Sequence, residues 1–350
     1  MIKLSLVMIV RNEEKVLARC LNSVLTVVDE IIVIDTGSTD STKEIASGFG
    51  AKIFEYEWQE DFAAARNYGL EQTTGQWVIV LDADEYILND CGDTIRTFIS
   101  ERQSIGRIRI TNKFVGENGL AFSNVYIKRL FPAHCRYVGS IHEQIASDLP
   151  SEIIDVNVFH DGYYNTNKSR RNIDILTKEL SNHPQDAYYL FQIAKEFNAL
   201  KEHNRVFDYL SKAYQLMQGN EPFAPNIVVD YMYSVNATRN FEIGLKVINE
   251  WQETLANFAD FHFVCGLFYL DLMISNPERY IHYLPKVEEC YLRCLTIGEN
   301  STYANVVGTG SFSAMNNLAA YYEVTGQKEK AAAFFENAKN TKAKFESSLT

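Results

Sequence analysis

Short apolar runs alternate with helix-length amphipathic stretches through the first part of the chain. The pattern predicts strands at residues 4–10, 30–34, 52–56 and 77–81, and helices at 14–25, 39–48 and 62–72. Strands and helices that alternate in this way are typical of a mostly parallel sheet with helices on both faces. Such a sheet places the carboxyl ends of its strands along one edge, where ligands bind.

A hairpin-like region follows this alternation. Residues 107–115 and 120–131 flank the turn-rich tetrapeptide at 116–119, and residues 131–161 carry short apolar pieces without a long helical pattern. The region is basic, with seven Lys or Arg between Arg102 and Arg136 against a single acid, Glu117. It is either a solvated hairpin face or a surface on which Arg129 helps to hold a diphosphate or an acceptor.

The second half of the chain has helical periodicity and repeats itself. Two units follow the spacing of small and aromatic positions found in tetratricopeptide repeats: Ile193, Ala194, Phe197, Leu210 and Ala213, and then Leu318, Ala319, Tyr322, Gly326, Ala331, Phe335 and Ala338. Weaker units lie between them, one stretched by an insertion near 276–285. A generic helical bundle is the alternative. We predict an α/β domain at 1–165, a connecting helix at 166–182 and an all-α repeat domain at 183–350.

Composition and charge narrow the class of protein. The 350 residues include 33 basic and 45 acidic ones, a net charge of −12, which argues against a general nucleic-acid binder. An apolar fraction of 46% excludes a disordered chain. The longest apolar runs fall short of a membrane span, and the first residues lack the pattern of a signal peptide. Six cysteines without a C-x-x-C pair fit a protein of the reducing cytoplasm.

Acidic residues follow two of the predicted strands. Asp35 ends the second strand, and Asp82 and Asp84 follow the strand at 77–81. Two carboxylates spaced by one residue can both reach one side of a chain that leaves a sheet, where they suit a hard divalent cation. The alternative is that they cap the next segment.

Several segments of the first half resemble family 2 glycosyltransferases with the GT-A fold. They are VRNEE at 10–14, IDTGSTDST at 34–42, DFAAARN at 61–67 and Asp82-Ala83-Asp84. Two later segments, VGSIHE at 138–143 and FHDGY at 159–163, resemble a subgroup. With its helical repeats, the chain is similar to the bacteriocin peptide S-glycosyltransferases of the sublancin type.

The resemblance implies roles for individual residues. It implies a nucleotide-sugar site made of Val10, Asn12, Glu14, Asp35, Ser38, Arg66, Asp82 and Ala83. It also implies Mg²⁺ or Mn²⁺ bound by Asp84 and His160, and Glu143 as the general base. To these we add two cations, Arg129 and Arg171, which could stabilise the leaving diphosphate. His160 could equally be a packed histidine at the polar edge of the core, and Arg171 part of a solvated helix face.

These observations predict an inverting, metal-dependent glycosyltransferase that moves a hexose or N-acetylhexosamine from a UDP-sugar to a peptide or protein, through Cys or Ser/Thr. The helical repeats would bind the acceptor or form a homodimer. One alternative is transfer to a sugar in cell-surface polysaccharide or lipooligosaccharide. A second, of another class, is a non-catalytic adaptor built on a decayed enzyme, which the intact Asp82-Ala83-Asp84, Glu143 and His160 disfavour.

Overall fold

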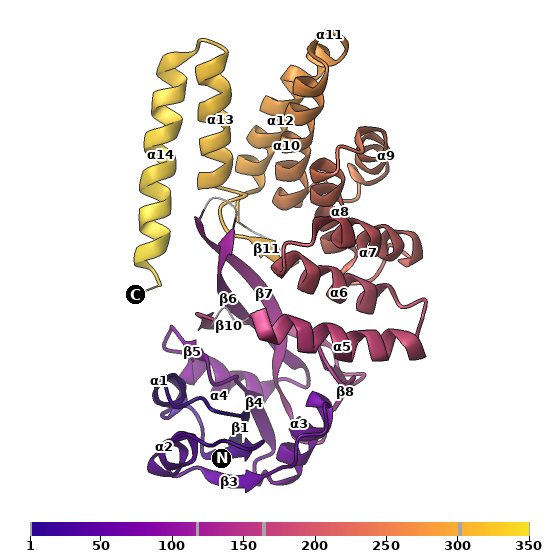
Figure 1. Ribbon diagram of the computed structural model, residues 1–350. Coiled ribbons are helices and arrows are strands. Elements are labelled where there is room, and N and C mark those ends of the chain that lie inside the picture. Colours follow the sequence, from indigo (N-terminus) through magenta and orange to yellow (C-terminus); the bar gives the residue numbers. More distant parts are fainter. Residues whose placement is uncertain (1, 117–118, 163–165, 300–302, 350) are drawn as a thin grey trace. The chain divides into compact units, whose positions relative to one another are not determined.

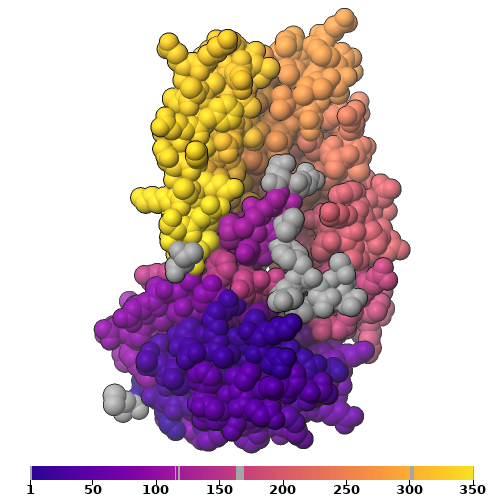
Figure 2. Space-filling view, turned by 60° about the vertical axis from the view of Figure 1, so that its left-hand side comes forward, coloured from indigo at the N-terminus to yellow at the C-terminus, as the bar shows by residue number. Residues whose placement is uncertain are grey.

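The computed structural model describes residues 2–116, 119–162, 166–299 and 303–349. The chain divides into two compact units, Met1–Tyr164 and Asn165–Thr350. In Figures 1 and 2 the first unit runs from indigo to magenta and the second from pink to yellow. The predicted hairpin turn at 117–118 and position 163 of the FHDGY segment lie outside the described residues.

The first unit alternates strands and helices in its amino-terminal part and then continues in strands. Its elements are β1 (Leu4–Val10), α1 (Leu17–Val24), β2 (Glu30–Asp35), α2 (Thr42–Gly48), β3 (Lys52–Glu55), α3 (Phe62–Glu71), β4 (Trp77–Val80), β5 (Glu85–Ile87), α4 (Gly92–Glu101), β6 (Ile105–Gly116), β7 (Gly119–Pro132), β8 (Arg136–Val138), β9 (Gln144–Ala146) and β10 (Ser151–His160).

The main sheet of this unit has the strand order β3-β2-β1-β4-β7-β6-β10-β5. Strands β3, β2, β1 and β4 are parallel neighbours, as are β6 and β10. The pairs β4/β7, β6/β7 and β10/β5 are antiparallel. The predicted α/β fold class is therefore confirmed, and the sheet is mixed because the later strands enter beside the parallel half.

Helices cover both faces of the sheet, as the alternation predicts. The larger core cluster joins Leu17 of α1, Ala46 of α2 and Ile95 of α4 to one face of the strands. The second cluster joins Ala63 and Leu70 of α3 to the opposite face. β8 and β9 form a separate antiparallel hairpin within the segment that has no helical pattern.

Two helices of this unit start later than the periodicity predicts. The helix expected from residue 39 begins at Thr42, because the Asp40 carboxylate accepts hydrogen bonds from the Thr42 amide and hydroxyl and holds a turn there. The helix expected from residue 14 begins at Leu17, since the amides of Val16 and Leu17 both donate to the Glu13 carbonyl in a preceding turn.

The second unit is almost entirely helical. Its elements are α5 (Thr166–Asn182), α6 (Ala187–Ala199), α7 (His203–Leu216), α8 (Ala224–Ala237), α9 (Phe241–Trp251), α10 (Ala259–Ser275), α11 (Pro277–Tyr280), the 3₁₀ helix η1 (Ile281–Tyr283), α12 (Leu284–Ile297), the two-residue strand β11 (Asn305–Val306), α13 (Phe312–Val324) and α14 (Lys328–Ser347). The predicted insertion near 276–285 forms α11 and η1.

Helices of this unit pair as hairpins, which Figure 1 shows most clearly for α13 and α14. The small residues of the repeat pattern are buried between paired helices, with Ala194 and Ala319 at 1% and 0% exposure. Gly326 makes the turn between α13 and α14 at φ 81°, a left-handed conformation that favours glycine. Phe335, an aromatic position of the repeat pattern, is 43% exposed on α14.

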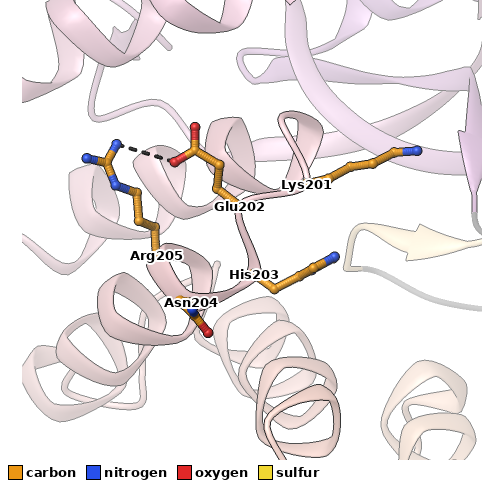
Figure 3. A pocket seen from close by; sticks show the side chains of 5 residues that line it. All are labelled: Lys201, Glu202, His203, Asn204 and Arg205. Atoms are coloured by element: carbon orange, nitrogen blue, oxygen red, sulfur yellow. Dashed lines mark ion pairs between the residues drawn. The ribbon is translucent and has the colours of Figure 1, made fainter.

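A hollow of about 500 Å³ lies at the turn between α6 and α7 (Figure 3). It is lined by residues 201–205, and Glu202 pairs there with Arg205 at 3.4 Å. The guanidinium carbon of Arg205 lies 4.7 Å from the ring centre of Phe197. None of the predicted site residues lines this hollow. Within the described residues, no helix combines the length and apolar character needed to cross a membrane.

Candidate active site

The carboxyl ends of β1 and β2 bring the first group of predicted site residues together. Val10 and Asp35 are directly paired in the parallel ladder, and both are 2% exposed. The Val10 carbonyl accepts hydrogen bonds from the Thr36 amide at 3.0 Å and the Thr36 hydroxyl at 3.2 Å. This pairing fixes where the two following loops start.

The Asp35 carboxylate shapes the loop after β2 with one of its oxygens. Oδ1 accepts hydrogen bonds from the Gly37 amide at 3.0 Å and the Ser38 amide at 2.9 Å. Gly37 has φ 104°, which L residues rarely adopt, so a glycine suits this turn. The buried Oδ2 has no hydrogen-bond partner among the described residues. Because an unpaired buried acceptor is costly, this oxygen is available to a ligand donor.

The loop after β1 is joined to the same turn. Asn12 adopts φ 56°, and its amide donates to Ser38 Oγ at 3.0 Å while its Oδ1 accepts from the Thr39 amide at 2.8 Å. The Glu14 Oε2 accepts from the Ser41 amide at 3.1 Å. The structure therefore brings Val10, Asn12, Glu14, Asp35 and Ser38 together in two interlocked loops.

Asp82, which follows β4, lies between two arginines. Its Oδ1 pairs with Arg66 Nη2 at 2.9 Å and its Oδ2 with Arg129 Nη2 at 2.9 Å. Arg66 and Arg129 are 5% and 7% exposed. Partial burial would raise the pKa of Asp82, but Arg129 and Arg66 outweigh it and hold that pKa well below its usual range. Asp82 is thus a carboxylate that forms ion pairs with two buried arginines. The neighbouring Ala83 is buried at 4% exposure in the core.

Arg129 reaches this position through a β-bulge. Gly106 pairs with Leu130 and Arg107 with Lys128, so Arg129 is an extra residue of β7 without a partner on β6. Its guanidinium also pairs with Glu85 at 3.0 Å.

Glu85, the residue after Asp84, is a further member of this charge network, and no motif singles it out. Its Oε2 accepts from the Asp82 amide at 2.8 Å, and the residue is 3% exposed. Burial, together with the Asp82 charge, raises the pKa of Glu85 to about 7 against the lowering effect of Arg129. A carboxylate in a D-x-D-E run carries no signal that separates such a buried partner from a surface acid.

Glu143 lies at the end of the loop between β8 and β9 and forms an ion pair from Oε1 to Arg66 Nε. The loop is anchored on α3, since the Phe62 amide donates to the Ser140 carbonyl at 2.8 Å. Asn67 also exchanges hydrogen bonds of 2.9 and 2.8 Å with the backbone of Tyr137. Arg66 therefore links Glu143 to Asp82, and three ion pairs connect the predicted base to Arg129.

Asp84 and His160 meet at the other side of the D-x-D turn. Asp84 Oδ2 lies 3.2 Å from His160 Nε2, and the antiparallel pairing of β5 and β10 puts His160 opposite Glu85. Asn112 Oδ1, on the neighbouring strand β6, lies 2.8 Å from His160 Nδ1. Desolvation lowers the pKa of His160, but Asp84 and the nearby carboxylates raise it more, so the net direction is upward.

Arg171 belongs to the second unit rather than to the first. It lies in α5 of the second unit, where its exposed side chain donates to Asn172 Oδ1 at 3.0 Å from Nη2. Its proposed contact with the donor therefore stays a prediction.

The donor set at Asp84 and His160 suits a divalent cation only in part. A carboxylate oxygen and an imidazole nitrogen are ordinary ligands of Mn²⁺ and acceptable ones of Mg²⁺. Across the described ranges, however, no cluster of three or more His, Cys, Asp or Glu side chains is placed to hold a metal. An ion held here would need further oxygens from a bound ligand.

Residues 5–137 match the protein family described as Glycosyl transferase family 2. The first unit contains a family 2 glycosyltransferase domain. The matched range includes Asp35, Arg66, Asp82 and Arg129, whereas Glu143 and His160 lie beyond it. The assignment of those two residues to the glycosyltransferase site rests on their contacts with Arg66 and Asp84.

Two curated relatives and one solved structure show what the chain is similar to. A TPR repeat-containing protein from Synechococcus elongatus is 45% identical over 105 residues, which are 30% of this chain and 26% of that protein. The SPbeta prophage-derived glycosyltransferase SunS from Bacillus subtilis is 30% identical over 219 residues, 59% of this chain and 51% of that protein. The chain thus spans between about a quarter and a half of these relatives.

The solved structure is glucosyl-3-phosphoglycerate synthase from Mycobacterium tuberculosis in complex with Mn²⁺, uridine-diphosphate and phosphoglyceric acid. It is 22% identical and covers 32% of this chain and 43% of its own, with a TM-score of 0.27.

Proposed function

We propose that the protein is an inverting, metal-dependent glycosyltransferase that transfers a hexose or N-acetylhexosamine from a UDP-sugar to a peptide or protein side chain, Cys or Ser/Thr. The observation that carries the proposal is the Asp84–His160 pair beside the arginine-held Asp82, within a unit that contains a family 2 glycosyltransferase domain. A metal ligand pair and buried cations in one place suit a diphosphate leaving group.

The nucleotide end of the donor would occupy the two loops after β1 and β2. The unpaired Asp35 Oδ2 is an acceptor suited to a ring N–H such as that of uracil. Val10, Asn12, Glu14 and Ser38 would border the base, because the hydrogen bonds between the loops already hold them there. The rigid loops would lower the ordering cost of binding.

The diphosphate end would meet the metal and the cations. Asp84 and His160 would hold Mg²⁺ or Mn²⁺, which supplies Lewis-acid stabilisation of the negative charge that develops on the leaving diphosphate. Asp82 would contact the ribose or sugar beside Ala83, and Arg129 and Arg171 would add positive charge near the phosphates. The Arg66–Asp82–Arg129 chain keeps the turn that carries Asp84 in a single geometry.

Glu143 would remove the acceptor proton. The ion pair with Arg66 holds the Glu143 carboxylate at the candidate site. Its second oxygen, Oε2, has no hydrogen-bond partner among the described residues, so it could face an acceptor hydroxyl or thiol. Direct displacement with inversion needs such a base on the side opposite the leaving group.

The acceptor and cellular setting follow from the second unit and the cysteines. A helical array offers an extended surface on which a peptide can lie, or through which two copies can associate. All six cysteines are buried free thiols, which supports a reaction in the cytoplasm.

Calorimetry with UDP and MnCl₂ tests the donor site. We expect UDP to bind in the presence of Mn²⁺, and Asp84→Asn to abolish that dependence on metal. Asp93→Asn, the same change at an exposed position of α4, is the matched control and should bind like the wild type. Binding that is indifferent to Mn²⁺ and to Asp84→Asn would favour the non-catalytic adaptor.

Turnover tests the base. A screen of UDP- and GDP-sugar hydrolysis with Mn²⁺ should identify the donor. Glu143→Gln should then abolish transfer to acceptor and leave UDP affinity within about twofold, because the carboxylate acts on the acceptor proton. Near-normal transfer by Glu143→Gln would remove Glu143 from the mechanism.

A further inference from the structure

One face of the β6–β7 hairpin carries cations at regular spacing. Side chains alternate between the two faces of a strand, and Ile108 and Ile110 belong to the core cluster that also contains α4 residues. Residues 107, 109, 111 and 113 of β6 therefore point to the opposite face. Their partners on β7 follow from the register: Arg107 with Lys128, Arg109 with Tyr126, Thr111 with Asn124, and Lys113 with Phe122. We call Arg107, Arg109, Lys113 and Lys128 the basic face.

The charges of the basic face are not balanced by any ion pair that the described residues form. None of the four forms an ion pair or a side-chain hydrogen bond with another residue in the described part of the chain, and the Nε atoms of Arg107 and Arg109 are buried without an acceptor. Arg107 and Lys128 also stand directly across from each other, and like charges in that position destabilise a sheet. Arg19, Arg66, Arg96 and Arg129 of the same unit are all paired with carboxylates. The basic face therefore costs stability that an anionic ligand would recover.

The basic face adjoins the candidate active site. Lys128 immediately precedes Arg129, which contacts Asp82. A molecule bound along β6 and β7 would thus have one end beside the Arg66–Asp82–Arg129 chain.

The spacing of the face fits an extended chain. Alternate residues of a strand lie about 7 Å apart, which is also the spacing of alternate side chains in an extended peptide. The half-buried ring of Tyr126, which is paired with Arg109, lies among the cations and offers apolar surface to such a chain. A compact anion such as a free phosphate would need only one or two of these positions.

We propose that the basic face binds an acidic, extended segment of the polypeptide acceptor and so presents the neighbouring side chain to the active site. This inference rests on the proposed function, since it names the chemistry of the acceptor for that same site. Arg107 and Arg109 would donate hydrogen bonds to carboxylates of this segment, which would satisfy their unpaired Nε atoms. Lys113 and Lys128 would contact further carboxylates along the hairpin.

Fluorescence anisotropy of the full chain with a fluorescein-labelled hexaglutamate peptide tests the proposal. The wild type should bind hexaglutamate with an affinity that falls as salt rises, and should not bind labelled hexaglutamine. Arg107→Gln/Arg109→Gln should weaken hexaglutamate binding about tenfold. Lys113→Gln/Lys128→Gln removes less buried charges and keeps the test valid if the arginine variant does not fold. Arg102→Gln/Lys339→Gln, the same loss of charge at exposed positions, should bind like the wild type.

Two results would overturn the proposal. One is equal hexaglutamate affinity in the wild type and both basic-face variants. The other is tighter binding of inorganic tripolyphosphate than of hexaglutamate, lost in the same variants, which would assign the face to phosphate. Calorimetric UDP affinity with Mn²⁺, expected to be unchanged in the basic-face variants, separates the two proposals. Loss of hexaglutamate binding with no UDP binding in any protein would keep the basic face and reject the donor site.

Discussion

Replacing Arg66 tests the charge arrangement of the site without any substrate. The Arg66 side chain is 7% exposed and pairs with Asp82 at 2.9 Å and with Glu143. Arg66→Met keeps most of the apolar stem and removes the guanidinium. Two carboxylates then face the space that the cation occupied, and Asp82 retains Arg129 as its only counterion among the described residues.

The expected loss of stability can be worked from this geometry. Removing one partner of a buried ion pair costs about 3–5 kcal/mol, because the other charge stays desolvated. Glu143 is 12% exposed and loses its ion pair, whereas Asp82 is 38% exposed and keeps one. We therefore expect the lower end of the range, a loss of about 3 kcal/mol in the free energy of unfolding of the first unit at neutral pH.

Urea unfolding followed by tryptophan fluorescence measures this loss. Trp58 and Trp77 report on the first unit, and a Trp251→Phe background removes the tryptophan of the second. Glu143→Gln combined with Arg66→Met should recover part of the loss, with a coupling energy of about 1–3 kcal/mol in a double-mutant cycle.

The pH dependence supplies a second test of the same pair. The folded-state pKa of Asp82 is lowered, so its stabilisation is present above the unfolded-state value of about 4 and is lost as the pH falls further. The cost of Arg66→Met should accordingly shrink in acid. A cost below about 1 kcal/mol at neutral pH, typical of exposed pairs, would refute the reasoning. So would a cost that does not change with pH.

Three further predictions address packing, protonation and metal binding. Gly69→Ala would bring a methyl group within 2.7 Å of a buried valine carbon and should cost about 1–3 kcal/mol in urea unfolding, whereas Gly48→Ala meets nothing within 4 Å and should be neutral or stabilising; equal effects would contradict this. Burial raises the pKa of Asp260 to about 7, so the folded chain binds the carboxyl proton more tightly than the unfolded chain does. Between pH about 4 and about 7 the wild type should therefore lose stability relative to Asp260→Asn as the pH rises. A stability difference that stays constant over this range would exclude the effect. Asn112→Ala removes the partner of His160 Nδ1 and should weaken calorimetric Mn²⁺ affinity in the presence of UDP about tenfold; unchanged affinity would show that Asn112 does not orient the imidazole.

The parallel half of the fold was predictable because its signals are local. An apolar strand followed at once by a carboxylate places Asp35 and Asp82 at strand ends, and parallel strands share that edge. The sequence pattern did not predict where the later strands, β7, β6, β10 and β5, join the sheet. Periodicity indicates that a strand exists but not which strand it pairs with. Fold class therefore follows from the pattern, whereas strand order in the second half of the sheet does not.

The contacts of the candidate site differ in the same way in how far local sequence signals predict them. The contact between Arg66 and Glu143 joins positions 77 residues apart through a loop with no secondary-structure signal, so only the resemblance to a family suggested that both belong to one site. Asn112 carries no motif and meets His160 only because β6 and β10 are neighbours in a particular register. Arg129 was suspected from local charge alone, and the bulge that aims it has no signature in the sequence.

Because Arg129 is the extra residue of that bulge, the pairing of β6 with β7 does not depend on it. Leu130 already pairs with Gly106 and Lys128 with Arg107, so deleting Arg129 would close the ladder into continuous register and keep every other side chain of β7 on its present face. A deletion elsewhere in the strand would exchange the core and basic faces. Loss of a single codon could thus remove the Arg129 charge from the candidate site and leave the register of the sheet unchanged. A variant that lacks only this inserted residue would therefore test the charge of the candidate site apart from the pairing of the strands.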